Sequence, residues 1–212
     1  MTRRLVLRTA AAADVPALVE NALGEDRESG RFAPRRPASH FTAAYWRKHV
    51  RLLEESRRLG RSVVFYLFTR GKGPRLVGHV GLGNIVRGAF QAADLGYALR
   101  KEFEGRGTMT EALRAVVPYA FDRMHLHRLM ADHLPSNRRS ARVLRKFRFR
   151  REGLARDYLL IDGRWRDHEM TSLVNPRWTP APGDEVARAA IRTRRRGAPR
   201  SGRPSTGGSP RQ

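Results

Sequence analysis

The segment from Leu95 to Leu113 constrains the fold of this chain more than any other. An apolar stretch, Leu95–Leu99, leads to a turn that contains Gly105 and Gly107 and then passes directly into an amphipathic stretch. In that stretch apolar side chains recur at three- and four-residue spacing, which is typical of a helix with one buried face. The segment therefore predicts a strand, a tight turn and a helix in immediate succession.

Hydrophobic periodicity predicts the remaining elements. The expected order is strand, helix, helix, three strands, helix, strand, helix and two strands. It predicts a mixed α/β domain in which an antiparallel meander feeds a parallel β-α-β step. The expected strands are 5–8, 62–69, 76–86, 94–99, 128–133, 149–155 and 169–174, and the expected helices are 12–23, 41–59, 107–124 (bent at Pro118) and 137–147, with a long loop at 24–40.

The balance of charges bears on partners rather than on the fold. Lysine and arginine outnumber aspartate and glutamate by 43 to 20, which gives a formal net charge of +23. Such an excess favours polyanions, for example RNA or a phosphorylated cofactor. A solvated, arginine-rich surface with no polyanionic partner is the alternative explanation.

The composition changes at Pro180. Residues 180–212 are rich in Pro, Gly, Ser, Ala and Arg and contain no aromatic residue, so they cannot bury enough apolar surface to offset the entropy lost on ordering. Nine arginines against Asp184 and Glu185 give residues 177–212 a net charge of +7, which leaves +16 for residues 1–176. The sequence predicts a folded domain over 1–179 and a disordered basic tail over 180–212.

Several classes of protein are excluded by what the chain lacks. It contains no cysteine, which excludes a disulfide scaffold, a cysteine-ligated metal site and a cysteine nucleophile. The spacing of histidines and carboxylates matches no metal-ligand pattern, so no metal is expected. No apolar stretch approaches the roughly 20 residues of a membrane span, and Leu5–Leu7 is too short for a signal peptide. We expect a cytoplasmic protein without a membrane partner, and we expect Trp165 and Trp178 to pack against the sheet.

The glycine turn has the chemistry of an anion site. Glycines at 105 and 107 allow a tight turn, so that the backbone N–H groups of residues 105 to 110 can converge on one point. The helix that follows adds its own unpaired N–H groups and its partial positive charge, and Arg106 adds a formal charge. Such a site suits a pyrophosphate, although the turn is neither a Walker motif nor a complete dinucleotide fingerprint.

A second basic segment runs from Pro135 to Phe149. Ser136 or Asn137 is expected to be the N-cap of the helix that follows. Five cations recur along that helix, at Arg138, Arg139, Arg142, Arg145 and Lys146. They could hold a ligand with several phosphates, or they could form a solvated basic face.

These segments together resemble the GNAT acetyltransferases, which use acetyl-CoA. The resemblance is carried by Tyr97–Leu113, by Asn137 and Ser140 in an Asn-x-x-Ser motif, and by the exit Phe147–Gly153. The run Arg151–His168 is more specific, because it resembles the RimJ branch, the ribosomal-protein alanine N-acetyltransferases.

The resemblance covers about residues 3–180 and is strongest over 95–178. It departs from the family's phosphate loop at two positions, where Glu104 replaces Gln or Arg and Met109 replaces a small residue. The resemblance implies the GNAT fold: a mixed, mostly antiparallel sheet with one parallel, splayed strand pair and flanking helices. It also implies direct acetyl transfer from acetyl-CoA in a ternary complex, without a metal.

The resemblance further implies roles for single residues. Ser140 would protonate the leaving thiolate, with Tyr158 as the alternative acid. Asp94 is the expected base, with Asp157, Glu111 and His79 as rivals. The strand at Tyr97–Leu99 would direct a backbone N–H at the thioester oxygen. The expected cofactor-binding residues are Ala98, Leu99, Arg100, Gly105, Arg106, Gly107, Thr108, Met109, Thr110, Asn137, Ser140 and Lys146.

The RimJ-like run favours the N-terminal alanine of a ribosomal protein as the acceptor. The basic surface and the tail suggest contact with the ribosome or its RNA. Two alternatives remain open: an N-acetyltransferase for a small amine such as an antibiotic, polyamine or amino-sugar, and a ribosome- or RNA-binding assembly factor built on the same scaffold.

Overall fold

The structure is a computed structural model that describes residues 2–29, 32 and 34–180. The chain divides into two units, Met1–Pro176 and Arg177–Gln212, and the helices and strands described below belong to the first. Apart from Pro180, the predicted tail lies outside the described residues. Within the described part of the chain, no helix is both long enough and apolar enough to cross a membrane.

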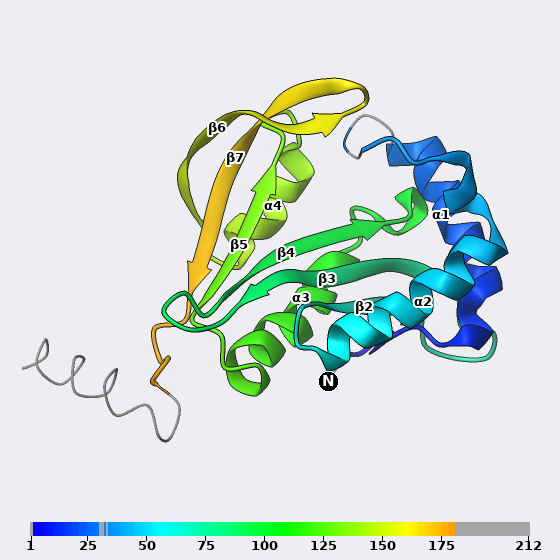
Figure 1. The fold of residues 1–212 in the computed structure, drawn as a ribbon, viewed down its shortest axis with the longest axis horizontal. Coiled ribbons are helices and arrows are strands. Elements are labelled where there is room, and N and C mark those ends of the chain that lie inside the picture. The colour runs from blue at the N-terminus through cyan, green and yellow to red at the C-terminus, as the bar shows by residue number, and fades with distance from the viewer. Residues whose placement is uncertain (1, 30–31, 33, 181–212) are drawn as a thin grey trace, which may run out of the picture. The chain divides into compact units, whose positions relative to one another are not determined.

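Seven strands form one sheet in the order β1-β2-β3-β4-β5-β7-β6 (Figure 1). Only β4 and β5 are parallel, and the other neighbours are antiparallel. The mixed fold and the predicted order of elements are therefore confirmed. The elements are β1 (Leu5–Arg8), α1 (Val15–Ser29), α2 (Ala43–Arg58), β2 (Val63–Thr69), β3 (Leu76–Val86), β4 (Ala92–Leu99), α3 (Thr108–Pro118), β5 (Arg128–His133), α4 (Arg138–Lys146), β6 (Arg150–Ile161) and β7 (Arg164–Val174), with 3₁₀ turns η1 (Ala12–Asp14), η2 (Ala38–Phe41) and η3 (Lys101–Phe103) and a π-helical turn η4 (Tyr119–Arg123).

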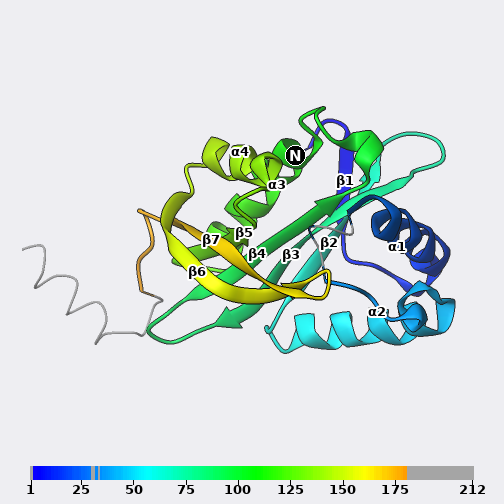
Figure 2. The same ribbon diagram turned by 90° about the horizontal axis from the view of Figure 1, so that it is seen from above.

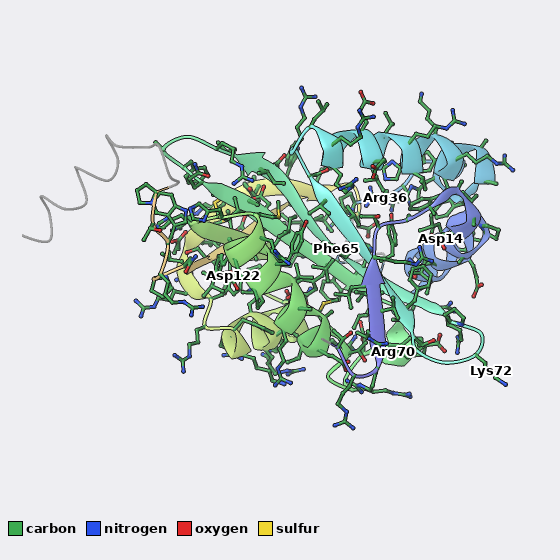
Figure 3. All side chains as sticks on the ribbon, turned by 90° about the horizontal axis from the view of Figure 1, so that it is seen from below. Asp14, Arg36, Phe65, Arg70, Lys72 and Asp122 are labelled. Atoms are coloured by element: carbon green, nitrogen blue, oxygen red, sulfur yellow. The ribbon has the colours of Figure 1, made fainter. Side chains whose placement is uncertain are left out.

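Helices cover both faces of the sheet because the strands alternate their apolar side chains. On β2, Phe65 and Leu67 pack in the core cluster that contains residues of α3 and α4, whereas Tyr66 and Phe68 pack in the cluster of α1 and α2. Figure 2 shows the two pairs of helices on opposite sides of the sheet, and Figure 3 labels Phe65 on β2 between α2 and α3.

The parallel pair separates after three residues. Ala92–Asp94 pair with Arg128–Met130, and beyond that point β4 continues with β3 alone to Leu99. Over the same distance β5 continues with β7 to His133. Figure 1 shows the two strands diverging, and we call the interruption of strand pairing between them the opening of the sheet. The expected splayed strand pair is present, and it places an opening in the middle of the sheet.

Two predictions of local structure were wrong. The loop expected at 24–40 is shorter, because α1 runs through Gly24 to Ser29; a single glycine weakens a helix without ending it. The strands expected at 149–155 and 169–174 are the outer parts of a longer hairpin of β6 and β7. β6 is an edge strand with most side chains exposed, so it lacks the alternation that marks a half-buried strand.

Trp165 and Pro118 differ in how well they follow the sequence expectation. Trp165, expected to pack against the sheet, is 61% exposed near the end of this hairpin. Pro118 ends the α-helical part of its helix, and a π-helical turn follows it. Proline has no N–H to donate, so it disturbs the regular hydrogen-bond ladder at the predicted position.

A glycine brings β3 and β4 unusually close at the opening. A Cβ on Gly78 would lie 2.3 Å from the carbonyl oxygen of Ala98 and 2.9 Å from the Cα of Leu99. We expect Gly78→Ala to lower the free energy of unfolding by about 1 to 3 kcal/mol, because the backbone has to move to make room. Gly83→Ala is the control, since a Cβ on Gly83 in the same strand meets nothing within 4 Å. Urea unfolding of both variants measures the effect, and equal midpoints would contradict the close approach.

Candidate active site

The glycine turn leads into α3 as the sequence predicts. Gly105 and Gly107 have φ of +71° and +73°, in the left-handed region that favours glycine, and Gly107 is the N-cap of α3. The side chains of Thr108 and Met109 are buried in the protein. The first N–H groups of a helix have no intrahelical acceptor, so this turn offers a ligand its backbone rather than its side chains. The burial of Met109 explains how a large residue is accommodated there.

Arg4 holds the start of α3 in place. Its backbone N–H and its Nε donate to the carboxylate of Glu111 at 2.6 and 2.7 Å, and its Nη1 donates to the carbonyl of Arg106 at 3.1 Å. Burial by itself would raise the pKa of Glu111, but the hydrogen bonds from Arg4 outweigh it and the pKa is lowered. Glu111 is therefore an ionised anchor for the loop, which argues against it as the base.

A second arginine neutralises the other carboxylate of the loop. Arg139, in the first turn of α4, donates to Glu104. Glu104, whose negative charge would repel a pyrophosphate, is thus paired with a cation of α4. Lys146 lies exposed at the other end of α4, and Thr110 lies in the first turn of α3.

A pair of hydroxyl groups connects β4 to α4. Asn137 caps α4 by accepting a hydrogen bond from the Ser140 N–H at 3.1 Å. The Ser140 hydroxyl lies 2.9 Å from the hydroxyl of Tyr97, so the two are hydrogen-bonded. Burial raises the pKa of Tyr97 to about 12, although the bond to Ser140 acts in the opposite direction. Tyr97 keeps its proton at physiological pH and can donate a hydrogen bond to the Ser140 hydroxyl.

Sequence analysis did not assign a side-chain role to Tyr97. The only available signal was general: a tyrosine on a strand whose neighbours face the core needs a partner for its hydroxyl. That partner is 43 residues further along the chain, and no local pattern identifies it.

Along β4, the backbone groups of alternate residues point towards β3 or towards the opening. The Arg100 N–H donates to Val77 on β3 at 2.9 Å, and the Ala98 carbonyl also lies against β3. Backbone groups alternate along a strand, so the N–H groups of Tyr97 and Leu99 are directed at the opening left by β5. The Arg100 guanidinium pairs with Glu20 at 2.9 Å, which ties it to α1 rather than to the opening.

Asp94 lies on the opposite face of the sheet from Ser140. Its neighbours Ala93 and Leu95 pack with α3 and α4, so its own side chain projects to the other side. There its carboxylate accepts a hydrogen bond from Asn84 at 2.8 Å. Tyr158 is on this side as well, because the carboxylates of Asp132 and Asp94 add to burial in raising its pKa. The structure therefore separates Tyr158 from Ser140, its companion in the predicted acid role.

The two other rival bases lie elsewhere. Asp157 has φ +45° in an irregular stretch of β6, and its N–H donates to Asp167 at 3.0 Å, so its position shapes the strand. His79 lies in β3, where its ring centroid is 6.1 Å from that of Tyr66.

Taken together, the opened sheet and the glycine turn at the N-terminus of α3 define a class. The chain belongs to the GNAT acetyltransferases: residues 4–150 match the family described as acetyltransferase (GNAT) domain. The resemblance seen in the sequence is confirmed, and the protein is an N-acetyltransferase by family.

Individual relatives narrow the comparison. The chain is 37% identical over 179 residues to the ribosomal protein uS5-alanine N-acetyltransferase of Escherichia coli (strain K12), covering 84% of this chain and 92% of that enzyme. It is similar to the crystal structure of the ribosomal-protein-S5-alanine acetyltransferase from Vibrio fischeri, with a TM-score of 0.81 and 29% identity over 85% of this chain and 98% of that one. Mycobacterium smegmatis RimJ in complex with CoA-disulfide gives a TM-score of 0.77 and 26% identity, covering 89% and 92%.

The buried tyrosine predicts a distinct pH dependence of stability. The pKa of Tyr97 is about 12 in the folded protein and about 10 in an unfolded chain. Its contribution is complete below pH 10 and is lost as the pH rises towards 12, because the folded state retains the proton. Between pH 10 and pH 12 the free energy of unfolding of the wild type should therefore fall by about 2 to 3 kcal/mol more than that of Tyr97→Phe, which has no hydroxyl to titrate. Urea unfolding at several pH values measures this, with exposed Tyr119→Phe as the control; parallel curves for Tyr97→Phe and wild type would contradict it.

Proposed function

We propose that this protein transfers an acetyl group from acetyl-CoA to the N-terminal alanine of a ribosomal protein. The observation that carries the proposal is the 37% identity over 179 residues to an enzyme that acts on uS5. An alignment of that length in a chain of 212 residues must include residues 34–179, and therefore the candidate site apart from its two N-terminal contacts, Arg4 and Glu20.

The phosphates of acetyl-CoA fit the turn before α3. Backbone N–H groups at Gly105 to Thr110 and the partial positive charge of the helix suit a pyrophosphate. Arg4 and Arg139 support this assignment, because they neutralise the carboxylates of Glu111 and Glu104 beside it. The CoA ligand of the M. smegmatis relative supports it too.

The thioester would lie in the opening between β4 and β5. The N–H groups of Tyr97 and Leu99 face that opening and can stabilise negative charge on the carbonyl oxygen. Ser140, with Tyr97 behind it, protonates the sulfur that leaves. Asp94 lies on the other side of the sheet, where it meets the incoming amine in its ammonium form. Acetyl transfer is direct, and the chain contains no cysteine that could carry an acetyl group.

Contact with the ribosome is part of the proposal. Residues 1–176 carry a net charge of +16, which favours attraction to ribosomal RNA near the acceptor. Figure 3 shows side chains ending in nitrogen around the outside of α2 and α4. The basic residues beyond 180 would add to this attraction as a tether.

The cofactor assignment predicts a loss of binding at Gly107. Gly107→Asp places a carboxylate at the proposed pyrophosphate position, so acetyl-CoA affinity measured by calorimetry should fall by at least about tenfold. Gly73→Asp is the matched control, since its φ of +72° equals that of Gly107 within one degree and no atom lies within 4 Å of its Cβ. If both variants bind acetyl-CoA as the wild type does, the loop does not hold the pyrophosphate.

The acceptor can be identified by mass spectrometry. Ribosomal proteins from cells with and without this protein should differ by one acetyl group on one N-terminal alanine. The purified enzyme should acetylate the corresponding N-terminal peptide and leave the same peptide with a blocked α-amine unchanged. A higher kcat/KM for a polyamine, an amino-sugar or an antibiotic amine would instead identify a small-molecule acetyltransferase.

A further inference from the structure

A buried histidine and an aspartate form a pair beside the opening of the sheet. Asp132 lies on β5, two residues beyond Met130, which is the partner of Asp94. Its neighbour Ala131 packs in the core with α3 and α4, so Asp132 projects to the same face as Asp94. His168 on β7 is only 4% exposed, and its Nε2 lies 3.8 Å from Asp132 Oδ1.

The histidine is held in one orientation. Its Nδ1 is 3.0 Å from the carbonyl oxygen of Arg166, and since a carbonyl only accepts, Nδ1 carries the hydrogen. The remaining nitrogen is therefore directed at Asp132. The Asp132 side chain is 30% exposed, so its carboxylate lies between the buried imidazole and the open side of the sheet.

The ring of Tyr158 closes this group. Its centroid is 5.6 Å from that of His168, in an edge-on contact. An irregular stretch of β6 between Ala155 and Leu159 directs it there, and Asp167 supports that stretch by accepting the Asp157 N–H. A carboxylate, an imidazole and a phenol from three strands thus converge next to Asp94.

We propose that Asp132 takes the proton from the amino group of the acceptor, that Asp94 holds this group as an ammonium beforehand, and that His168 is a positioning residue for Asp132. The proposal rests on the proposed function, because it requires an amine acceptor. It assigns the base to Asp132, one strand away from the residue that sequence analysis favoured.

The charges around Asp132 suit this role. Burial raises its pKa above the ordinary value, and the carboxylate of Asp94 on β4 raises it further, whereas His168 on β7 and His133 on its own strand lower it. Tyr158 faces it from β6. An N-terminal amine has a pKa of about 7.7 to 8.0, so a carboxylate with a raised pKa is a better acceptor for its proton than an ordinary one.

The proton balance is complete without another reactant. The ammonium gives one proton to the Asp132 carboxylate, and the freed lone pair forms the C–N bond at the thioester carbon. The C–S bond then breaks and the sulfur takes a proton from Ser140. The second proton lost by nitrogen replaces the one that Ser140 gave, and Asp132 returns its own proton to solvent.

The test is the pH dependence of kcat at saturating acetyl-CoA and acceptor peptide. Wild-type kcat should be flat from pH 6.5 to 8, because Asp132 deprotonates the bound ammonium. Asp132→Asn should reduce kcat at pH 6.5 by about 10² to 10⁴. Its kcat should then rise about tenfold per pH unit towards the pKa of the amine, because only neutral amine reacts. A flat profile at near wild-type rate in Asp132→Asn would overturn the proposal.

Three further variants separate the possible explanations. Below the flat range, kcat should fall as Asp132 becomes protonated, and this fall is the acid limb of the profile. His168→Gln removes a group that lowers the pKa of Asp132. The acid limb of this variant should therefore move to higher pH, with an unchanged KM for acetyl-CoA. An unmoved limb would overturn the positioning role. Asp122→Asn, an exposed aspartate on η4 that Figure 3 labels, should behave as the wild type. Ser140→Ala should lower kcat without changing the shape of the acid limb.

The test also distinguishes a folding defect of Asp132→Asn from a failure of the proposed function. If Asp132→Asn does not fold, Asp132→Glu decides the matter: it keeps a carboxylate and should keep the flat profile, and the sloping profile of a neutral-amine reaction would overturn the role. If the wild-type enzyme does not acetylate any N-terminal peptide, the proposed function fails and this role fails with it. Normal turnover with an unaltered profile in Asp132→Asn overturns the role of Asp132 alone.

Discussion

The separation of β4 from β5 after three paired residues is the constraint on which the site depends. β4 stays with β3, and at Gly78 the two backbones approach so closely that no side chain fits between them. β5 instead stays paired with β7 along its whole length. The backbone N–H groups of Tyr97 and Leu99 are consequently directed at an opening, and backbone N–H groups need hydrogen-bond partners. A ligand that lies along β4 can supply them.

The opening also divides the charges of the molecule. On the side of α3 and α4, the carboxylates of Glu111 and Glu104 are each bound by an arginine, so this side can accept phosphates. On the other side, Asp94 accepts a hydrogen bond from the neutral amide of Asn84, and Asp132 faces His168. No arginine or lysine pairs with these two carboxylates among the described ion pairs, so their negative charge can attract an ammonium group. A strongly basic protein can thus hold an anionic and a cationic reactant on opposite faces of one sheet, because charge pairs act over short distances when salt screens the rest.

Local features of the sequence were read correctly where neighbours along the chain decide them. Gly105 and Gly107 adopt the positive φ that the turn requires, Asn137 caps α4, and β3 and β5 begin and end at the predicted residues. The errors fall where tertiary contacts decide. β6 is an edge strand whose pattern carries little information, and α1, whose apolar residues up to Ala22 pack in the cluster with α2 and β2, continues through a single glycine.

The sequence by itself determined the order of the elements, the turn before α3 and the family, because periodicity, capping and glycine conformation depend on residues only a few positions apart. Only the tertiary structure decided which side chains meet. Tyr97 bonds Ser140 across 43 residues and Arg4 binds Glu111 across 107, while Asp132 and His168 face each other because β5 and β7 pair in one register. The physical reason is that a shift of a strand by one residue turns every side chain to the opposite face, so these contacts are properties of the assembled sheet and not of any segment in it.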